Sequence, residues 1–384
     1  MKLLITTDDY LPRWDGIARF LNELLPRITN CEITVIAPDF GIVRAKDYEL
    51  IQIPLQKHSI SDYTPAKYAR KIIDEQVKKA DIIFNQSLGT IGLAAILSAK
   101  KRNKPLLSYV HSIEWELTPR IIKNPFLRRI LYYMSKSYAK ALYNKCTALI
   151  VPSEQIADYL TRNKVYTKKL VAHLGVDTNK FTPQTISSKK AARKELELPQ
   201  DAYIIGYHGR LAPEKNLQTL LRAFIGLNIP NKKLLIVGDG IAQVKDKLRR
   251  EDVILVGKQD DVIPYLQAMD CYVLPSYTET TSLSVLEAMA CSLPVISSKV
   301  GYVRHYVKNT ENGFFFNMFS AHDLKKKLRT VYQLSQEEKQ ALTKKARKTV
   351  EEQFQWDNTA TKILGHLNSF LPEQQTKKQQ VTNN

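Results

Sequence analysis

The sequence predicts an α/β protein built from two doubly wound domains. Short apolar runs alternate with helical patterns along the chain, which is typical of parallel sheets covered by helices on both faces. At 384 residues the chain exceeds the size that one hydrophobic core usually serves. A polar, lysine-rich stretch separates the runs into two series, and such stretches are typical of domain boundaries.

The apolar runs give the predicted strands in chain order. In the first series they are 2–5, 33–37, 82–84, 106–110 and 148–151. In the second series they are 204–207, 234–237, 253–256, 271–274, 295–297 and 314–316. The first run is interpreted as a strand, not as a signal peptide, because Thr6, Thr7, Asp8 and Asp9 interrupt it before an apolar core forms.

These strands define the expected domains. The first domain covers residues 1–181, a linker covers 182–200, and the second domain covers 201–355. Helical patterns continue beyond the last strand, and we expect the one over 356–371 to pack back against the first domain. The glutamine- and lysine-rich tail 372–384 has no apolar face and is expected to be disordered.

Composition narrows the class of protein. Cys31, Cys146, Cys271 and Cys291 form no C-x-x-C pair, which argues against a zinc site and a disulfide framework and favours a reducing cytoplasm. No stretch reaches the roughly 18 apolar residues of a membrane span. The formal net charge of +19 favours anionic partners, which include nucleic acid, anionic lipid and phosphorylated small molecules.

The segment 274–296 carries the strongest candidate site. A predicted strand ends near Leu274, a polar turn follows, and a helix begins near Leu283. Ligands bind at the carboxyl ends of parallel strands, and the amides at a helix N-terminus suit a phosphate or a sugar oxygen. Glu279 in the turn and Glu287 on the helix can each accept hydroxyl hydrogen bonds from one elongated ligand. The alternative is a solvated loop acid and an ordinary acid near a helix N-terminus.

The spacing E-x7-E, followed by A-M-A and P-V-I, resembles glycosyltransferase family four, the retaining enzymes of the GT-B fold. Similar motifs cover most of the chain: Gly209-Arg210-Leu211 with Glu214-Lys215-Asn216, Val237-Gly238-Asp239-Gly240, Val151-Pro152-Ser153-Glu154, and Gly175-Val176-Asp177 with Phe181. The resemblance implies two Rossmann-like domains facing a central cleft. It also implies transfer of a hexose from a nucleotide diphosphate sugar to an acceptor hydroxyl.

The same resemblance implies the site residues. The donor would contact Gly16, Gly209, Arg210, Lys215, Gly238, Glu279, Thr280, Thr281, Ser282, Leu283 and Glu287. Arg210 and Lys215 would meet the negative charge that develops on the leaving diphosphate. Since the chain contains no D-x-D motif, no metal and no cofactor is expected. Glu279 would hold the sugar, and Glu287 would take the ribose hydroxyls.

A histidine that contacts the donor sugar and helps to organise the transition state is also implied. His111 directly follows the strand 106–110, so it lies at a carboxyl strand end. With Glu279, Arg210 and Lys215 it completes the expected catalytic set. The alternative is that His111 is a structural histidine whose hydrogen bonds are satisfied within the fold.

The chain departs from the family pattern at several positions. Asn216 and Ser292 stand where glycine is usual, Ser282 replaces a glycine near the first glutamate, and Asp15 replaces the first glycine of a pair that ends at Gly16. The segment 301–305 replaces a G-G-x-x-E motif. The fold tolerates such changes, whereas donor and acceptor preferences do not transfer across them.

The segment 119–145 is basic, contains no acidic residue and is interleaved with aromatic and aliphatic residues. A helix of this kind can lie in a lipid interface. The candidate membrane contacts are Arg120, Lys123, Phe126, Arg128, Arg129, Tyr132 and Tyr133. The alternative is an ordinary amphipathic helix that packs on the sheet and solvates its charges.

The leading hypothesis is therefore a cytoplasmic hexosyltransferase that uses a nucleotide sugar and an acceptor glycan or glycolipid, with peripheral contact to anionic membrane. A nucleotide-sugar epimerase of the same architecture is the second enzyme hypothesis. A non-enzymatic basic binder of nucleic acid or membrane is the third, and no nucleic-acid module is recognised, so nucleic acid is not expected as a partner. A dinucleotide dehydrogenase is disfavoured because no G-x-G-x-x-G motif follows the first strand.

Overall fold

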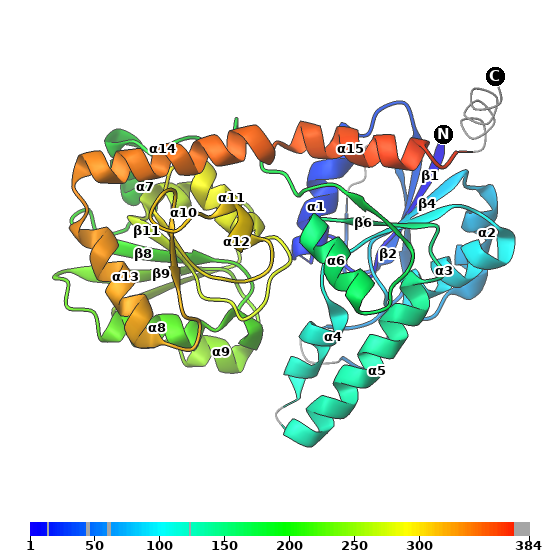
Figure 1. Ribbon diagram of the computed structural model, residues 1–384, viewed down its shortest axis with the longest axis horizontal. Helices are drawn as coiled ribbons and strands as arrows, with labels where there is room; N and C mark the ends of the chain where they lie inside the picture. The colour runs from blue at the N-terminus through cyan, green and yellow to red at the C-terminus, as the bar shows by residue number, and fades with distance from the viewer. Residues whose placement is uncertain (14, 44–46, 60–62, 123, 372–384) are drawn as a thin grey trace. The chain divides into compact units, whose positions relative to one another are not determined.

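A computed structural model describes residues 1–13, 15–43, 47–59, 63–122 and 124–371, and the predicted disordered tail lies outside these residues. The chain divides into two units. Unit 1 consists of Met1–Leu174 and Trp356–Asn384, and unit 2 consists of Gly175–Gln355. Each unit contains one parallel sheet with helices packed on it (Figure 1).

The sheet of unit 1 has seven described strands in the order β3-β2-β1-β4-β5-β6-β7, and all of their pairings are parallel. The strands are β1 (Lys2–Thr6), β2 (Glu32–Pro38), β3 (Glu49–Ile53), β4 (Ile82–Asn85), β5 (Leu106–Tyr109), β6 (Ala148–Val151) and β7 (Lys168–Val171). The five predicted strands are all present. The edge strands β3 and β7 were not predicted because they are only partly buried and therefore lack a continuous apolar run.

The helices of unit 1 cover this sheet. They are α1 (Gly16–Leu24), α2 (Arg70–Lys79), α3 (Thr90–Arg102), α4 (Glu114–Leu117), α5 (Pro125–Tyr143), α6 (Glu154–Arg162) and α15 (Trp356–Asn368), with 3-10 turns η1 (Leu25–Arg27) and η2 (Thr118–Ile121). Helix α15 ends the described chain but packs within unit 1. The Trp356 and Phe20 ring centroids are 5.5 Å apart, and the Thr359 hydroxyl donates to the His173 carbonyl at 2.8 Å.

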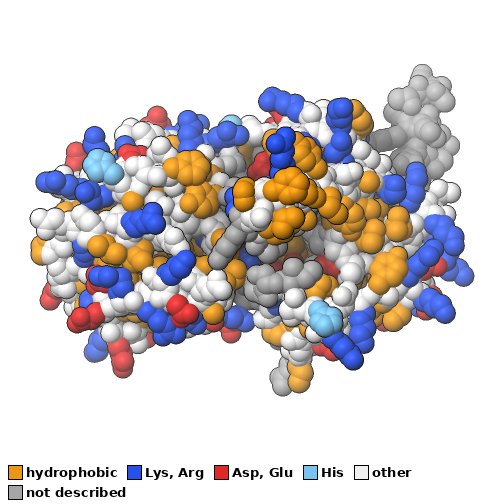
Figure 2. Space-filling view, turned by 90° about the horizontal axis from the view of Figure 1, so that it is seen from below, with side chains coloured by type: hydrophobic (Ala, Val, Ile, Leu, Met, Phe, Trp, Pro, Cys, Tyr) orange, Lys and Arg blue, Asp and Glu red, His pale blue; other side chains and the backbone are white. Residues whose placement is uncertain are grey.

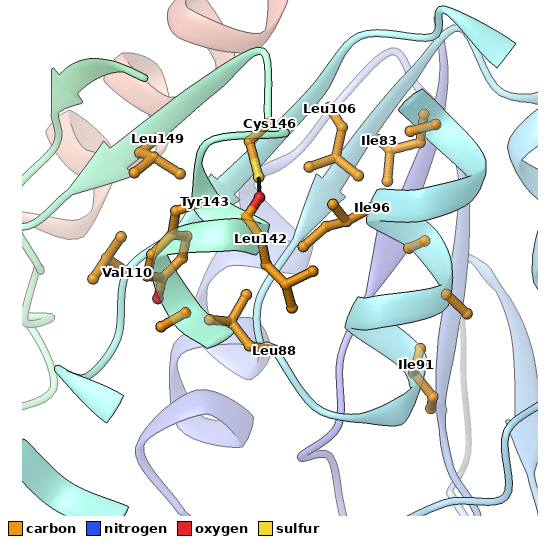
Figure 3. Close-up of a cluster of buried hydrophobic side chains, with 14 of the residues drawn as sticks. Ile83, Leu88, Ile91, Ile96, Leu106, Val110, Leu142, Tyr143, Cys146 and Leu149 are labelled. Atoms are coloured by element: carbon orange, nitrogen blue, oxygen red, sulfur yellow. Dashed lines mark hydrogen bonds between the residues drawn. The ribbon is translucent and has the colours of Figure 1, made fainter. Parts of the chain in front are cut away.

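One large apolar cluster of unit 1 includes side chains of the sheet, of α3 and of the end of α5 (Figure 3). Aliphatic side chains from β4 and β5 lie beside those of α3, and Leu142, Tyr143 and Cys146 lie between α3 and the side chains of Val110 and Leu149. Each fully buried aliphatic side chain contributes about 1.5–3 kcal/mol of transfer free energy. Burial raises the pKa of the Cys146 thiol to about 12, so this thiol stays protonated and packs as an apolar group.

The sheet of unit 2 has six described strands in the order β10-β9-β8-β11-β12-β13, again all parallel. The strands are β8 (Tyr203–His208), β9 (Lys232–Val237), β10 (Val253–Gly257), β11 (Cys271–Leu274), β12 (Val295–Ser298) and β13 (Phe314–Phe316). All six were predicted. The strand order reverses between β8 and β11, and this switch point is where ligands bind in open α/β sheets.

The helices of unit 2 connect these strands. They are α7 (Ile186–Glu195), α8 (Leu217–Ile225), α9 (Ala242–Asp246), α10 (Ile263–Ala268), α11 (Leu283–Ala290), α12 (Val303–Tyr306), α13 (Ala321–Gln333) and α14 (Gln336–Gln353), with the 3-10 turn η3 (Pro213–Lys215). Two apolar clusters on the two faces of the sheet form the core. Together the two parallel sheets confirm the predicted α/β class.

The segment 182–200 differs from the linker that the sequence suggested. It contains α7, which begins with a capping box at Thr185 and belongs to unit 2. The chain passes from unit 1 to unit 2 at Leu174 and Gly175 instead. The polar composition misled the prediction because one of its cations, Arg193, is buried and ion-paired to Asp270 at 2.7 Å, not solvated.

Helix α11 ends at a residue with a strained backbone. Ser292 has φ of 55°, a left-handed conformation that costs non-glycine residues about 1–2 kcal/mol. The amide of Ser292 bonds to the Met289 carbonyl and that of Leu293 to the Ala288 carbonyl, both at 3.0 Å, which is the helix-ending pattern that usually takes glycine.

We therefore expect Ser292→Gly to raise the free energy of unfolding by about 1 kcal/mol. Urea unfolding of the full chain would measure the change. Ser284→Gly is the control, because this serine lies inside α11 and its replacement should lower stability by a few tenths of a kcal/mol to about 1 kcal/mol. Equal changes in the two variants would contradict a strained backbone at Ser292.

Candidate functional site

The candidate site of unit 2 lies at the carboxyl ends of β8 and β11. The loop after β8 carries Arg210 and Lys215, and the loop after β11 carries Glu279 and leads into α11. These residues were predicted at strand ends, and the parallel pairing of β8 with β11 brings the two loops to the same edge of the sheet.

Lys215 and Glu279 meet directly. The Lys215 ammonium donates to Glu279 Oε1 at 2.7 Å, and the Ser276 hydroxyl donates to the same oxygen at 2.8 Å. The Lys215 and Glu279 side chains are 21% and 12% exposed, so both are accessible to a ligand while they are held in place. Two donors on one oxygen fix the orientation of the Glu279 carboxylate.

Asn216 explains why this loop tolerates the loss of the usual glycine. Its φ is 52°, and asparagine adopts this left-handed conformation more readily than other side chains. Its amide nitrogen also donates to the Pro275 and Met318 carbonyls at 3.0 and 2.9 Å. The asparagine therefore ties the loop after β8 to the loop after β11, which glycine could not do.

The loop after β12 holds the Glu279 segment from another side. A Cβ atom on Gly301 would lie 1.8 Å from the Glu279 carbonyl oxygen, so only glycine fits there. The Tyr302 amide donates to the Thr280 carbonyl at 2.7 Å, and the Ser298 hydroxyl donates to the Ser276 carbonyl at 2.6 Å. The backbone around Glu279 is thus fixed by two neighbouring loops.

Gly209 and Gly238 bring the loops after β8 and β9 into contact. Their φ angles are 141° and 138°, and a Cβ on Gly238 would lie 2.0 Å from the Gly209 carbonyl oxygen. The Gly238 amide in turn bonds to the Gly257 carbonyl at 2.7 Å. These glycines allow the backbones of the two loops to approach each other closely.

The N-terminus of α11 faces the same site. Ser282 caps the helix by accepting from the Val285 amide. The neighbouring Thr281 hydroxyl is buried, and it has no hydrogen-bond partner among the residues that the structure describes. A buried hydroxyl at a helix N-terminus, where the helix dipole favours negative charge, suits an anionic or hydroxyl-bearing ligand.

Arg210 lies in this loop but has a partner within it. Its guanidinium is bonded to Glu214, one turn further along the chain, and its carbonyl accepts from the Tyr207 hydroxyl at 2.9 Å. The side chain is one-third exposed. Arg210 is therefore accessible to a ligand, as Lys215 is, and each of the two cations is held by a carboxylate of unit 2.

Glu287 is more buried than the sequence suggested. Its Oε2 atom lies 2.6 Å from His208 Nε2, and the two side chains are 5% and 2% exposed. His208 was not predicted as part of the site. A single histidine at the end of a strand has no characteristic spacing, so its contact with Glu287 became visible only in the folded unit.

His111 and Gly16 belong to unit 1. His111 follows β5, and its Nε2 lies 3.0 Å from Gln86 Oε1. Its ring packs against those of Phe20 and Tyr109, and this burial lowers the pKa of His111 to about 3. His111 is therefore a neutral imidazole at physiological pH.

Gly16 begins α1, whose first amides are already capped. The Asp15 carboxylate accepts from the Ile17 and Ala18 amides, both at 2.9 Å. Asp15 is the residue that replaces the first glycine of the expected pair. Its carboxylate therefore occupies the amide groups that a phosphate would otherwise contact at this helix N-terminus.

Helix α5 exposes an unusual number of large apolar side chains. Phe126 and Met134 are 71% and 63% exposed, and Leu127, Ile130, Tyr133 and Tyr138 are also exposed. Arg128 and Arg129 are exposed beside them, while Tyr132 is half-buried. Of the other predicted membrane contacts, Lys123 and the side chain of Arg120 lie outside the described residues.

Basic side chains elsewhere are spread over the surface. The space-filling view shows lysine and arginine residues distributed across the visible face, with hydrophobic side chains between them (Figure 2). None of the described helices is long and apolar enough to cross a bilayer.

A parallel sheet in each unit, with a lysine–glutamate pair and glycine-rich loops at the strand ends of the second, agrees with the GT-B fold of glycosyltransferases. Residues 14–180 match the model of Glycosyltransferase Family 4, and residues 188–349 match that of Glycosyl transferases group 1. The chain belongs to glycosyltransferase family 4, whose members are retaining nucleotide-sugar glycosyltransferases. These matches confirm the family and the fold that the motifs predicted.

Relatives and solved structures agree with this family. The chain is 27% identical over 348 residues to the alpha-monoglucosyldiacylglycerol synthase of Acholeplasma laidlawii, covering 83% of this chain and 85% of that protein. It is 23% identical to the capsular polysaccharide biosynthesis glycosyltransferase CapM of Staphylococcus aureus, covering 97% and 98% of the two chains. The crystal structure of Anabaena HepE in complex with UDP superposes with a TM-score of 0.77, at 18% identity and over 96% and 100% of the two chains.

Proposed function

We propose that this enzyme transfers a hexose from a nucleoside diphosphate sugar to an acceptor hydroxyl of a glycolipid or lipid-linked glycan. The observation that carries the proposal is the Lys215–Glu279 contact of 2.7 Å beside the N-terminus of α11. It combines a cation for a phosphate with a carboxylate for sugar hydroxyls. The resemblance of the donor motifs to those of the family supports the same assignment.

In this proposal Lys215 and Arg210 stabilise the leaving diphosphate. The bond between the anomeric carbon and the β-phosphate oxygen breaks, and negative charge develops on that phosphate. The two cations meet this charge. Glu279 and the amides of 280–283 hold the sugar, with the buried Thr281 hydroxyl beside them, while Gly209 and Gly238 let the backbone approach the donor.

The acceptor oxygen forms its bond to the anomeric carbon on the face that the diphosphate leaves. The hydroxyl proton passes to the departing phosphate, so the proposal assigns no separate protein base. The family resemblance assigns His111 of unit 1 to the donor sugar; its imidazole is neutral, and its Nε2–H donates to Gln86 Oε1. Gly16 allows the backbone to approach the donor closely. It adds few free amide donors, because the Asp15 carboxylate already accepts from the Ile17 and Ala18 amides.

The experiment that tests this proposal is a panel of nucleotide sugars screened by thermal stabilisation of the full chain. A ligand that binds only the folded state at 100 times its Kd adds about 2.7 kcal/mol of stability. The stabilising donor is then assayed for transfer to diacylglycerol and glycolipid acceptors. Turnover of the donor without any acceptor would favour the epimerase, and no stabilisation by any nucleotide sugar would contradict the proposal.

The glycolipid acceptor is inferred from two observations. Two relatives, from Acholeplasma laidlawii and Streptococcus pneumoniae, are named alpha-monoglucosyldiacylglycerol synthases. Helix α5 combines exposed Phe126, Tyr133 and Met134 with the cations Arg128 and Arg129, a combination suited to the surface of an anionic bilayer. A peripheral contact through α5 would bring the enzyme to a lipid acceptor.

We expect the enzyme to sediment with vesicles that contain anionic lipid and to stay in solution with neutral vesicles. Changing both Arg128 and Arg129 to glutamine should weaken binding by about 2 kcal/mol, roughly thirtyfold. The matched control changes Arg249 and Arg250, two exposed arginines of unit 2, which removes the same charge. An equal loss in both double variants, or binding that ignores lipid charge, would contradict a specific role for α5.

A further inference from the structure

The contact between His208 and Glu287 joins two elements of the candidate site. His208 is the last residue of β8 and directly precedes Gly209 and Arg210, while Glu287 lies on α11. His208 Nε2 and Glu287 Oε2 are 2.6 Å apart. Because an ionised carboxylate can only accept, the proton of this hydrogen bond belongs to Nε2.

The fold holds the imidazole in place. β8 and β11 are neighbours in the sheet, and α11 follows β11, so a side chain at the end of β8 can reach the first turns of α11. The ring of Tyr272 on β11 lies 5.2 Å from the imidazole, and its hydroxyl donates to the His208 carbonyl at 3.3 Å. The imidazole is therefore fixed before any ligand arrives.

The hydrogen bond from His208 gives the buried Glu287 carboxylate a defined orientation. Leaving a buried charged group without its partner is costly, so Glu287 keeps His208 as a partner throughout. An ionised carboxylate offers about four acceptor positions, and the imidazole takes one of them. Interactions of this kind keep binding groups within a fraction of an ångström of the productive geometry.

We propose that His208 is a positioning residue that orients the Glu287 carboxylate to recognise the ribose diol of the donor nucleoside. This inference rests on the proposed function, since it requires a nucleoside diphosphate in the site. His208 also immediately precedes the loop that carries Arg210 and Lys215. The end of β8 therefore supplies the partner of the carboxylate and leads directly into the loop with the two cations.

The test compares the Kd of a nucleoside diphosphate with that of its 2′,3′-dideoxy counterpart. Isothermal titration calorimetry with the full chain would use the uridine, guanosine and adenosine pairs. In the unmodified enzyme we expect the dideoxy compound to bind about thirtyfold more weakly, because hydrogen bonds to a charged group are lost.

Two substitutions of His208 form a matched pair. His208→Gln places an amide nitrogen near the position of Nε2, whereas His208→Asn places one near Nδ1, too far from Glu287 to donate. We expect the glutamine variant to keep the ratio of the two Kd values within about threefold of the original, and the asparagine variant to lower it to about 3 or less. Glu287→Gln should also lower the ratio, which keeps the test valid if the asparagine variant does not fold.

The outcomes separate this inference from the proposed function. If no nucleoside diphosphate binds the unmodified enzyme, the proposed function fails. If the diphosphate binds but its dideoxy counterpart binds equally well, or if His208→Asn loses thermal stability yet keeps the original ratio, the function stands. In those two cases His208 is only a structural partner, and the inference is overturned.

Discussion

Replacing Lys215 with alanine is expected to lower kcat/KM for sugar transfer by about a thousandfold, which corresponds to about 4 kcal/mol of transition-state stabilisation. The reason is twofold. The variant loses a cation for the leaving diphosphate, and it removes the ammonium that fixes Glu279 Oε1 at 2.7 Å. The measurement is steady-state transfer with the donor identified by thermal stabilisation.

Lys245→Ala is the matched control for this prediction. Lys245 also pairs with a carboxylate of unit 2, Asp239, at 3.1 Å, and it has a similar exposure of 32%. Its loss should change kcat/KM by less than about threefold, since exposed ion pairs contribute about 0–1 kcal/mol. Near-normal transfer by Lys215→Ala, with normal folding, would remove the central assumption of the proposed site.

The second large effect concerns stability. Asp270→Ala is expected to lower the free energy of unfolding by about 3–5 kcal/mol. Asp270 accepts from the Arg193 guanidinium and from the Ile204 amide, both at 2.7 Å, and from the Lys189 ammonium at 2.6 Å. The Arg193 side chain is only 4% exposed, so the substitution leaves a buried cation without its counter-charge.

Hydrogen exchange of the β8 and α7 amides would measure this loss of stability within unit 2. The control is Glu352→Ala, which breaks the Lys348–Glu352 pair, where the side chains are 71% and 57% exposed. That change should cost less than about 0.5 kcal/mol. A similar small cost for Asp270→Ala would show that the buried pair adds little to the stability of unit 2.

The central strands could be predicted from the sequence because burial on both faces demands apolar residues. β4 and β11 are buried at every position, and both were predicted within about a residue. The edge strands β3 and β7 carry glutamate, glutamine and lysine among their apolar residues. Their pattern of polar and apolar residues therefore does not distinguish them from loops. The polar helix α7 was missed for a related reason, because composition does not show that the Arg193 side chain is buried.

The residues of the candidate site that belong to family motifs could be predicted from the sequence. Those that join the site through packing of the folded unit could not. Glu279 and Lys215 were identified from the family motifs, and the structure brings them into direct contact. His208 was missed, and the sequence did not show that it contacts Glu287, whose side chain is 5% exposed. This contact joins β8 to α11, and its geometry depends on the order of strands in the sheet and not on spacing along the chain.

The contacts among the loops after β8, β11 and β12 bear on how this enzyme can be redesigned. Asn216 bonds to the Pro275 carbonyl, and Gly301 contacts the Glu279 carbonyl so closely that no side chain fits between them. A single loop taken from a relative with another sugar preference would lack the neighbouring loops that it contacts in that relative. Under the proposed function, a change of donor preference by grafting would therefore require all three loops to be exchanged together.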